Sequence, residues 1–161
     1  MLTSHSRCHG APPKEPWHYS GEFAKIFKKT VEMKYKLMPY IYEQAKNAAE
    51  NGFPMIRTIF FEYPADQTAW LIEDEYFFGS NMLVAPLMDE NKYERDVYLP
   101  AGDWIDYQTG IRYGGEKWHA IASGEIPCVI LVKSGCEIAH IELAQSTCEM
   151  DWNTVKRTLY A

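Results

Sequence analysis

The sequence lacks any apolar run near the roughly 20 residues that a membrane-spanning helix needs. Basic residues are few, with 16 Lys and Arg against 22 Asp and Glu, and the formal net charge is −6. Such an acidic chain disfavours binding to nucleic acid or to anionic membrane surfaces. The opening residues MLTSHSRCHG also lack the apolar segment of a secretion signal. We therefore expect a cytoplasmic protein with neither a nucleic-acid nor a membrane partner.

Cysteine is also scarce, and none of the four residues forms a CxxC pair: Cys8, Cys128, Cys136 and Cys148. This spacing favours reduced thiols over a disulfide scaffold or a zinc module. A metal site built on His5, Cys8 and His9 would lack the fourth protein ligand that structural zinc requires. Phosphate-binding loops, dinucleotide fingerprints and nucleophile elbows are missing as well. We expect no metal and no cofactor.

Three prolines exclude a regular helix or central strand in the first 20 residues: Pro12, Pro13 and Pro16. A long helix is predicted to begin at Gly21, because Ser20 can cap it and Glu22 places negative charge in its first turn. Its apolar residues recur at helical spacing and form one stripe: Phe23, Ile26, Phe27, Leu37, Ile41, Ala45 and Ala48. Pro39 predicts a kink in this helix, and Gly52 predicts its end.

Beyond residue 53 the pattern changes from helical to extended. Residues 55–62 are rich in strand-forming side chains, and residues 65–73 are compatible with a short helix. Eight further strands are predicted between turn residues: 76–78, 82–87, 96–99, 104–107, 111–113, 117–122, 128–133 and 137–141. This spacing indicates an antiparallel β-sandwich. The predicted fold class is α+β, with a long N-terminal helix in residues 1–53 and the sandwich in residues 54–161.

The densest group of polar side chains precedes the helix, at Ser4–Gly10. Barrel enzymes place active-site residues on loops that lead from a strand into a helix. In such a loop Arg7 and His9 could orient a hydroxylated or anionic ligand by hydrogen bonds. The same residues also fit a structural loop, with Arg7 in an ion pair and His9 bonded to a backbone carbonyl.

Glycoside cleavage needs two carboxyl groups on either side of the bond, and no such pair is evident. The acidic residues fall in charged or turn-like contexts and are expected in solvent: Glu73–Glu75, Asp89, Glu90, Asp103 and Asp106. Four aromatic residues in the strand region could form a sugar-stacking platform: Trp104, Tyr107, Tyr113 and Trp118. Alternating aromatics in a sandwich also fit its core or an interface with a neighbouring domain.

Several segments resemble glycoside hydrolase family 31, in the order in which that family has them. The loop Ser4–Gly10 followed by Pro16-Trp17 resembles its SHSRxHG…PW segment, and residues 36–42 resemble its RLLPYLY helix. Residues 52–57 resemble GxPxMRP, with Thr58 in place of the usual proline. Four further blocks resemble FEFPDD, QYMFG, LLVAPV and YLPxGxW: residues 61–64, 76–79, 83–86 and 97–104. The loop and residues 141–147 are closer to the α-xylosidase branch than to the α-glucosidases.

The resemblance implies the C-terminal part of a retaining α-glycosidase, comprising the end of a (β/α)8 barrel and a β-sandwich. A whole barrel needs about 250 residues. The family's nucleophile and acid/base are aspartates of upstream segments that match nothing here, so the chain alone is expected to be inactive, with no catalytic residue of its own. His9 matches the family histidine that binds the sugar in the −1 subsite, and Arg7 is expected to support it.

Three alternatives remain open at this point. The enzyme could act on α-glucosides instead of α-xylosides, because both activities occur in the family. The chain could be a stand-alone carbohydrate-binding β-sandwich, or a scaffold that only supports the barrel. Without a barrel to cover the stripe that includes Leu37 and Ile41, self-association of the chain is also expected.

Overall fold

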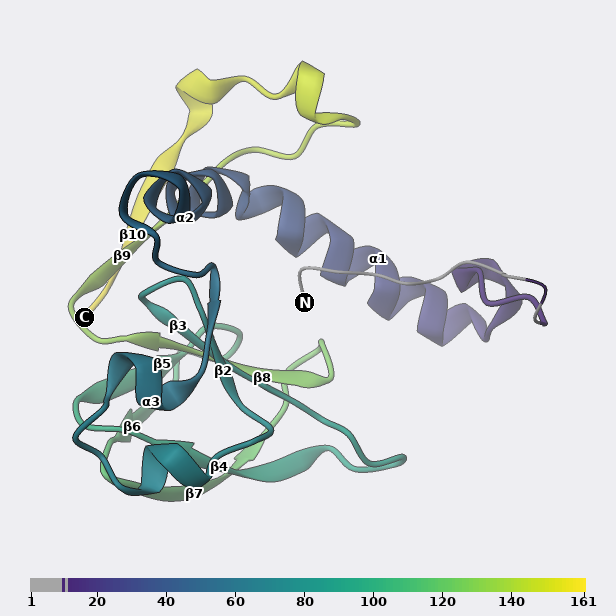
Figure 1. Cartoon of the computed structure of the whole chain (residues 1–161). Helices are drawn as coiled ribbons and strands as arrows, with labels where there is room; N and C mark the ends of the chain where they lie inside the picture. The colour runs from purple at the N-terminus through teal and green to yellow at the C-terminus, as the bar shows by residue number, and fades with distance from the viewer. Residues whose placement is uncertain (1–9, 11) are drawn as a thin grey trace.

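The computed structural model describes residue 10 and residues 12–161 (Figure 1). The helical part comprises η1 (Pro16–His18), α1 (Gly21–Lys36), α2 (Met38–Asn51), α3 (Ile59–Glu62) and η2 (Thr68–Leu71). The strands are β1 (Ile56–Arg57), β2 (Tyr76–Phe78), β3 (Met82–Pro86), β4 (Glu94–Leu99), β5 (Asp103–Asp106), β6 (Arg112–Gly114), β7 (Lys117–Ala122), β8 (Cys128–Lys133) and β9 (Cys136–His140). Two short helices and a last strand follow: η3 (Thr147–Glu149), η4 (Trp152–Thr154) and β10 (Lys156–Tyr160). The predicted α+β class is confirmed.

The long N-terminal helix is divided into α1 and α2 at Leu37, where ψ is 5°. Ser20 caps α1 as predicted, since its Oγ accepts a 3.2 Å hydrogen bond from the Phe23 N–H. Pro39 lies in the first turn of α2, where a backbone N–H has no partner within the helix. The predicted kink is thus a complete break, and the two helices run in different directions (Figure 1).

The predicted strand over residues 55–62 is wrong for most of its length. Only Ile56–Arg57 pairs with β2, and Ile59–Glu62 forms the short helix α3. The turn of helix buries Ile59 completely and stacks Phe60 on Trp70, with ring centroids 4.4 Å apart. Burial and packing here outweigh the strand preference of Ile and Phe, which is a weak local signal.

A six-stranded antiparallel sheet forms the centre of the molecule, in the order β1-β2-β3-β8-β5-β6. Its central strands β3 and β8 are apolar and almost entirely buried, because both faces of the sheet are covered. One face packs on the two-stranded sheet β4–β7 through a cluster that includes Phe77, Leu83, Trp104 and Leu131. Neighbouring residues along the strands point to the opposite face, as the strand period of two requires.

The opposite face packs on the helices and on β9. Its cluster includes Leu37 and Tyr40 from the helices together with Phe78, Met82 and Ile130 from the sheet. The Tyr40 hydroxyl donates to the Phe78 carbonyl at 2.7 Å and accepts from the Asn81 N–H at 3.3 Å. These contacts fix α2 to the β2–β3 turn.

The expectation of an uncovered helix stripe is corrected at Leu37, whose side chain is fully buried in the core of the chain itself. The sheet supplies the neighbours that the sequence alone could not identify. Phe23, at the other end of the stripe, is exposed and packs against the rings of Tyr19 and Phe27. Within the stripe, Leu37 alone is buried, Phe23 and Ala45 are exposed, and the others are half-buried: Ile26, Phe27, Ile41 and Ala48.

The last strand, β10, was not predicted from the sequence, and it pairs antiparallel with β9. Arg157 on this strand forms an ion pair with Glu43 on α2. Cys128, Cys136 and Cys148 are free thiols, whereas Cys8 lies outside the described residues. None of the described helices is long and apolar enough to cross a membrane.

Candidate functional site

Of the polar loop before α1, only the last residue, Gly10, belongs to the described residues. Arg7 and His9, the residues predicted to bind a ligand, lie outside the described residues. Gly10 has φ of +66°, a left-handed conformation that glycine adopts without strain. Beyond the prolines, Trp17 in η1 is 75 % exposed, and Ser20 then starts α1.

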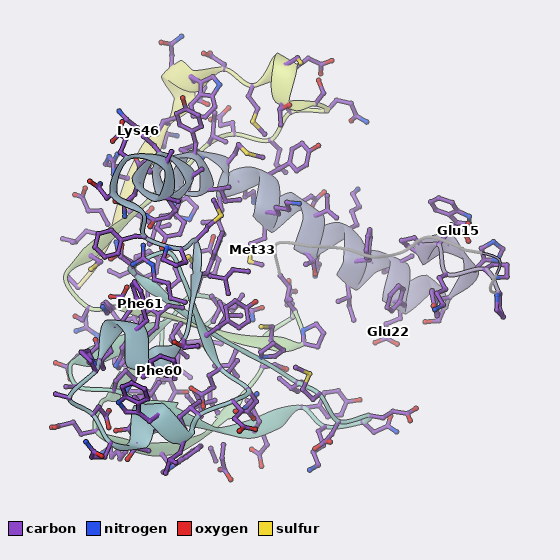
Figure 2. All side chains as sticks on the ribbon, in the orientation of Figure 1. Glu15, Glu22, Met33, Lys46, Phe60 and Phe61 are labelled. Carbon is purple, nitrogen blue, oxygen red and sulfur yellow. The ribbon has the colours of Figure 1, made fainter. Side chains whose placement is uncertain are left out.

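We call residues 54–161, which contain β1 to β10, the β-domain. The described end of the loop lies at the far end of α1 from this β-domain. Figure 2 shows Glu15 and Glu22 at that end, Met33 close to the β-domain, and Lys46 on α2. Glu15 and His18 are close in space, with Oε2 and Nε2 3.6 Å apart. Among the described residues, no strand of the β-domain lies beside Glu15 and Glu22 in the figure.

The four aromatic residues of the predicted sugar platform do not form one surface. Trp104 is fully buried in the core, and its Nε1–H donates to the Pro100 carbonyl at 2.9 Å. The Tyr107 hydroxyl lies 3.0 Å from His140 Nε2, and Tyr113 packs edge-on against His119. Only Trp118 keeps a large exposed face, at 52 %. The core interpretation is thus correct for Trp104, whereas the ring of Trp118 faces solvent.

Two acidic residues expected in solvent are buried. Asp106 is 1 % exposed, and its Oδ1 accepts the backbone N–H groups of Gln108 and Thr109, both at 2.8 Å. Glu75 is 4 % exposed and accepts the backbone N–H of Tyr98. A third inward-facing acid, Glu62, pairs with Arg57 and lies 3.8 Å from Lys133 Nζ. Each of these carboxylates has a structural partner, and none of them faces another across a cleft.

Sequence reasoning missed these acids because a charge pattern shows neither burial nor partners. Glu75 ends the acidic run Glu73–Glu75, and the only signal of its burial is the apolar strand β2 that follows directly. Its carboxylate bonds the Tyr98 N–H at 2.8 Å, on the edge of β4 that has no strand neighbour. Arg95 Nη2 approaches Glu75 Oε1 at 4.0 Å.

Burial raises the pKa of Glu75 from 4.5 to about 7, although the Tyr98 N–H and Arg95 both lower it. The folded protein therefore binds this proton more tightly than the unfolded chain does. The associated stability is fully present below pH 4.5 and is lost as the pH rises through 7. Across that range the loss for this one group is about 3 kcal/mol.

We expect Glu75→Gln to remove this part of the pH dependence. The amide keeps a carbonyl oxygen for the Tyr98 N–H but carries no charge, so its free energy of unfolding should stay level where that of the parent falls. Urea unfolding between about pH 4 and pH 8 measures the difference. Glu73→Gln, in the same acidic run but exposed, is the matched control and should follow the parent. Parallel curves for the parent and Glu75→Gln would contradict the assignment.

A metal centre finds no support in the described residues, where no three His, Cys, Asp or Glu side chains are grouped to hold an ion. Cys128 is buried, and burial raises the pKa of its thiol to about 11, so it is protonated and unreactive at neutral pH. The predicted cluster of His5, Cys8 and His9 lies outside the described residues. The described strand region is a packed β-domain with exposed indoles at Trp70, Trp118 and Trp152.

Two family models match the chain, one after the other. Residues 1–44 match the glycosyl hydrolases family 31 TIM-barrel domain, and residues 52–137 match the glycosyl hydrolase family 31 C-terminal domain. The first match includes the polar loop, α1 and the start of α2. The second includes β1 to β8 and the start of β9. The two matches agree with the resemblance seen in the sequence motifs.

Curated and solved relatives agree with these matches. Alpha-glucosidase 2 of Bacillus thermoamyloliquefaciens is 35 % identical over 83 % of this chain and 17 % of its own length. An alpha-xylosidase of Emericella nidulans is 31 % identical over 84 % of this chain and 18 % of its own length. A Flavobacterium johnsoniae GH31 dextranase complexed with glucose superposes with a TM-score of 0.84 at 31 % identity, over 94 % of this chain and 19 % of that one. The chain thus spans less than a fifth of the length of these three relatives, and it belongs to glycosyl hydrolase family 31.

Proposed function

We propose that this chain is the C-terminal segment of a retaining α-glycosidase that hydrolyses O-glycosyl bonds of α-xylosides or α-glucosides. The observation that carries the proposal is the pair of adjacent family matches, a barrel end at residues 1–44 and a C-terminal domain at residues 52–137. Relatives named alpha-glucosidase, alpha-xylosidase and dextranase support the substrate class. Of the two sugars we favour α-xylosides, because the SHSRxHG form of the loop is closer to the α-xylosidase branch.

Retaining hydrolysis needs a nucleophilic carboxylate and an acid/base carboxyl about 5–5.5 Å apart. The inward-facing acids of the described part already have structural partners: Asp106 holds turn amides, Glu75 holds a strand amide, and Glu62 pairs with Arg57. In our proposal the two catalytic aspartates lie in the rest of the barrel. This chain contributes the loop with Arg7 and His9 and the β-domain that supports the last barrel helix.

His9 orients the sugar in this proposal and transfers no proton. A hydrogen bond from a fixed imidazole to a sugar hydroxyl contributes to rate where it strengthens as the ring flattens toward the oxocarbenium-like transition state. Arg7, two residues earlier, holds the loop in position by its charge. The second role of the chain is mechanical. Tyr40 and Leu37 tie the helix to the sheet, so the loop at the start of α1 is anchored through α1 and α2.

In the complete enzyme we expect His9→Ala to lower kcat/KM for p-nitrophenyl α-xyloside by about 100-fold, mainly in kcat, with folding intact. Lys25→Ala, an exposed position on α1, is the control and should keep the parent rate. The same assay with p-nitrophenyl α-glucoside shows which of the two substrates has the higher kcat/KM in the parent enzyme. An unchanged kcat/KM in His9→Ala would leave only the supporting role for this loop.

A further inference from the structure

The outer face of the small sheet β4–β7 carries an exposed tryptophan. Val97, Leu99 and Ile121 point inward from this sheet and are buried in the core. The alternate residues therefore point outward, and on β7 these include Trp118 and Ala120, both exposed. Because Ala120 is small, it leaves open space next to the indole.

This space is a hollow of about 490 Å³, within the size range of about 300–1,000 Å³ that is usual for ligand pockets. Its lining includes Trp118 and Ala120 from β7 and Met88 from the β3–β4 connection. Six charged residues form most of the remaining lining: Asp74, Asp89, Lys92, Glu94, Arg95 and Asp96. Trp118 is the only aromatic side chain among the lining residues, so it provides the one flat apolar surface there.

The Trp118 side of the hollow is held in place before any ligand binds. Tyr98, across the strand pair from Trp118, packs on it with ring centroids 5.6 Å apart. The Tyr98 hydroxyl donates to Asp66 Oδ2 at 2.7 Å, and its backbone N–H donates to Glu75 at 2.8 Å. A platform fixed by such bonds loses little freedom when a ligand stacks on it.

The arginine of the polar wall is fixed in a similar way. The Arg95 side chain is only 14 % exposed and donates to the carbonyls of Pro86 at 2.8 Å and Asp74 at 3.2 Å, and it pairs with the Asp74 carboxylate. Lys92 Nζ lies 2.9 Å from Asp89 Oδ2. Four carboxylates against two cations give the lining a formal charge of −2. The hollow thus offers many acceptors, a few donors and a weakly negative field.

We propose that the Trp118 hollow binds a neutral oligosaccharide. The C–H face of a pyranose ring is apolar and slightly positive, and it stacks on the negative face of an indole. Sugar hydroxyls donate and accept hydrogen bonds, so they can pair with the free oxygen lone pairs of Asp96 and Glu94 and with the cations beside them. The negative lining repels sugars that carry carboxylate or phosphate groups. This inference goes beyond hydrolysis, because it concerns binding by the β-domain alone.

The test is an NMR titration of the isotope-labelled 161-residue chain with isomaltotriose, followed at the Trp118 indole N–H, which is assigned by its absence in Trp118→Ala. In the parent we expect a chemical-shift change that saturates with isomaltotriose concentration. Trp118→Phe should still bind, but more weakly. Trp118→Ala should show no saturable shift at the neighbouring amides of β4 and β7. Trp152→Ala is the matched control, since Trp152 is 48 % exposed but packs on Tyr42 instead. It should bind like the parent, and trigalacturonate, an acidic sugar of equal length, should not bind.

A parent chain that shows no saturable shift would overturn the proposal, and so would equal binding by Trp118→Ala. Binding that Trp152→Ala removes as completely as Trp118→Ala would also overturn it. If light scattering shows that Trp118→Ala converts a dimer into a monomer without any effect of sugar, the hollow is a contact between two copies and the proposal fails. None of these results depends on turnover, so each is separate from the proposed hydrolytic function.

Discussion

Replacing Gly79 with alanine is expected to detach α2 from the sheet and to lower the free energy of unfolding by about 2–5 kcal/mol. An added Cβ at Gly79 would lie 2.4 Å from the Tyr40 hydroxyl oxygen and 2.6 Å from Gln44 Cδ. Both neighbours belong to α2 and are buried, so a shift of either side chain changes the contact between α2 and the turn. The Tyr40 hydroxyl also bonds the Phe78 carbonyl and the Asn81 N–H on either side of the turn. The left-handed φ of +66° adds backbone strain for any residue with a Cβ.

Gly52→Ala is the matched control for this prediction. Its φ of +75° is similar, but nothing lies within 4 Å of the added Cβ. Gly52→Ala should therefore lower the free energy of unfolding only by the cost of a left-handed φ, about 1–2 kcal/mol. Urea unfolding monitored by helix circular dichroism and by Trp fluorescence compares the two variants. If both variants lost the same free energy of unfolding, the close approach of α2 to the turn at Gly79 would contribute nothing to the effect of the substitution.

The elements that a local pattern defines were predicted well from the sequence. The N-cap at Ser20, the predicted kink near Pro39, which the structure shows as a break, and the end at Gly52 each depend on one residue and its immediate neighbours. Strands β2, β7 and β8 have the predicted bounds because turn residues punctuate the chain there. The failures depend on tertiary contacts. Ile59–Glu62 is helical because it buries Ile59, and β10 exists because β9 offers it an edge.

The candidate site was predictable only in part, for a similar reason. Motif resemblance identified the family and selected Arg7 and His9, which lie outside the described residues. The roles of Glu75, Arg95 and Trp118 depend on which strands become neighbours, and residue spacing does not contain that information. Trp104 and Trp118 look equivalent as strand aromatics, yet one is fully buried and the other is 52 % exposed. Sheet pairing and the second covering layer decide which of them can meet a ligand.

The isolated 161-residue chain is expected to show no glycosidase activity, and this is the largest effect predicted for the molecule. Enzymes of this kind accelerate hydrolysis by at least about 10⁶-fold, and removal of the carboxyl couple eliminates both nucleophilic attack and leaving-group protonation. The buried acids Asp106 and Glu75 hold backbone amides, and Glu62 pairs with Arg57. Sugar binding at Trp118 would add affinity without chemistry, so it does not alter this expectation.

The direct measurement is release of p-nitrophenol from p-nitrophenyl α-xyloside and α-glucoside by the purified, folded 161-residue chain, with the complete enzyme as a positive reference. We predict a rate equal to that of buffer for both substrates at every chain concentration. Turnover that increases in proportion to the concentration of the chain, and that persists through successive purification steps, would contradict the proposal that these residues supply sugar binding and support but no catalytic carboxylates.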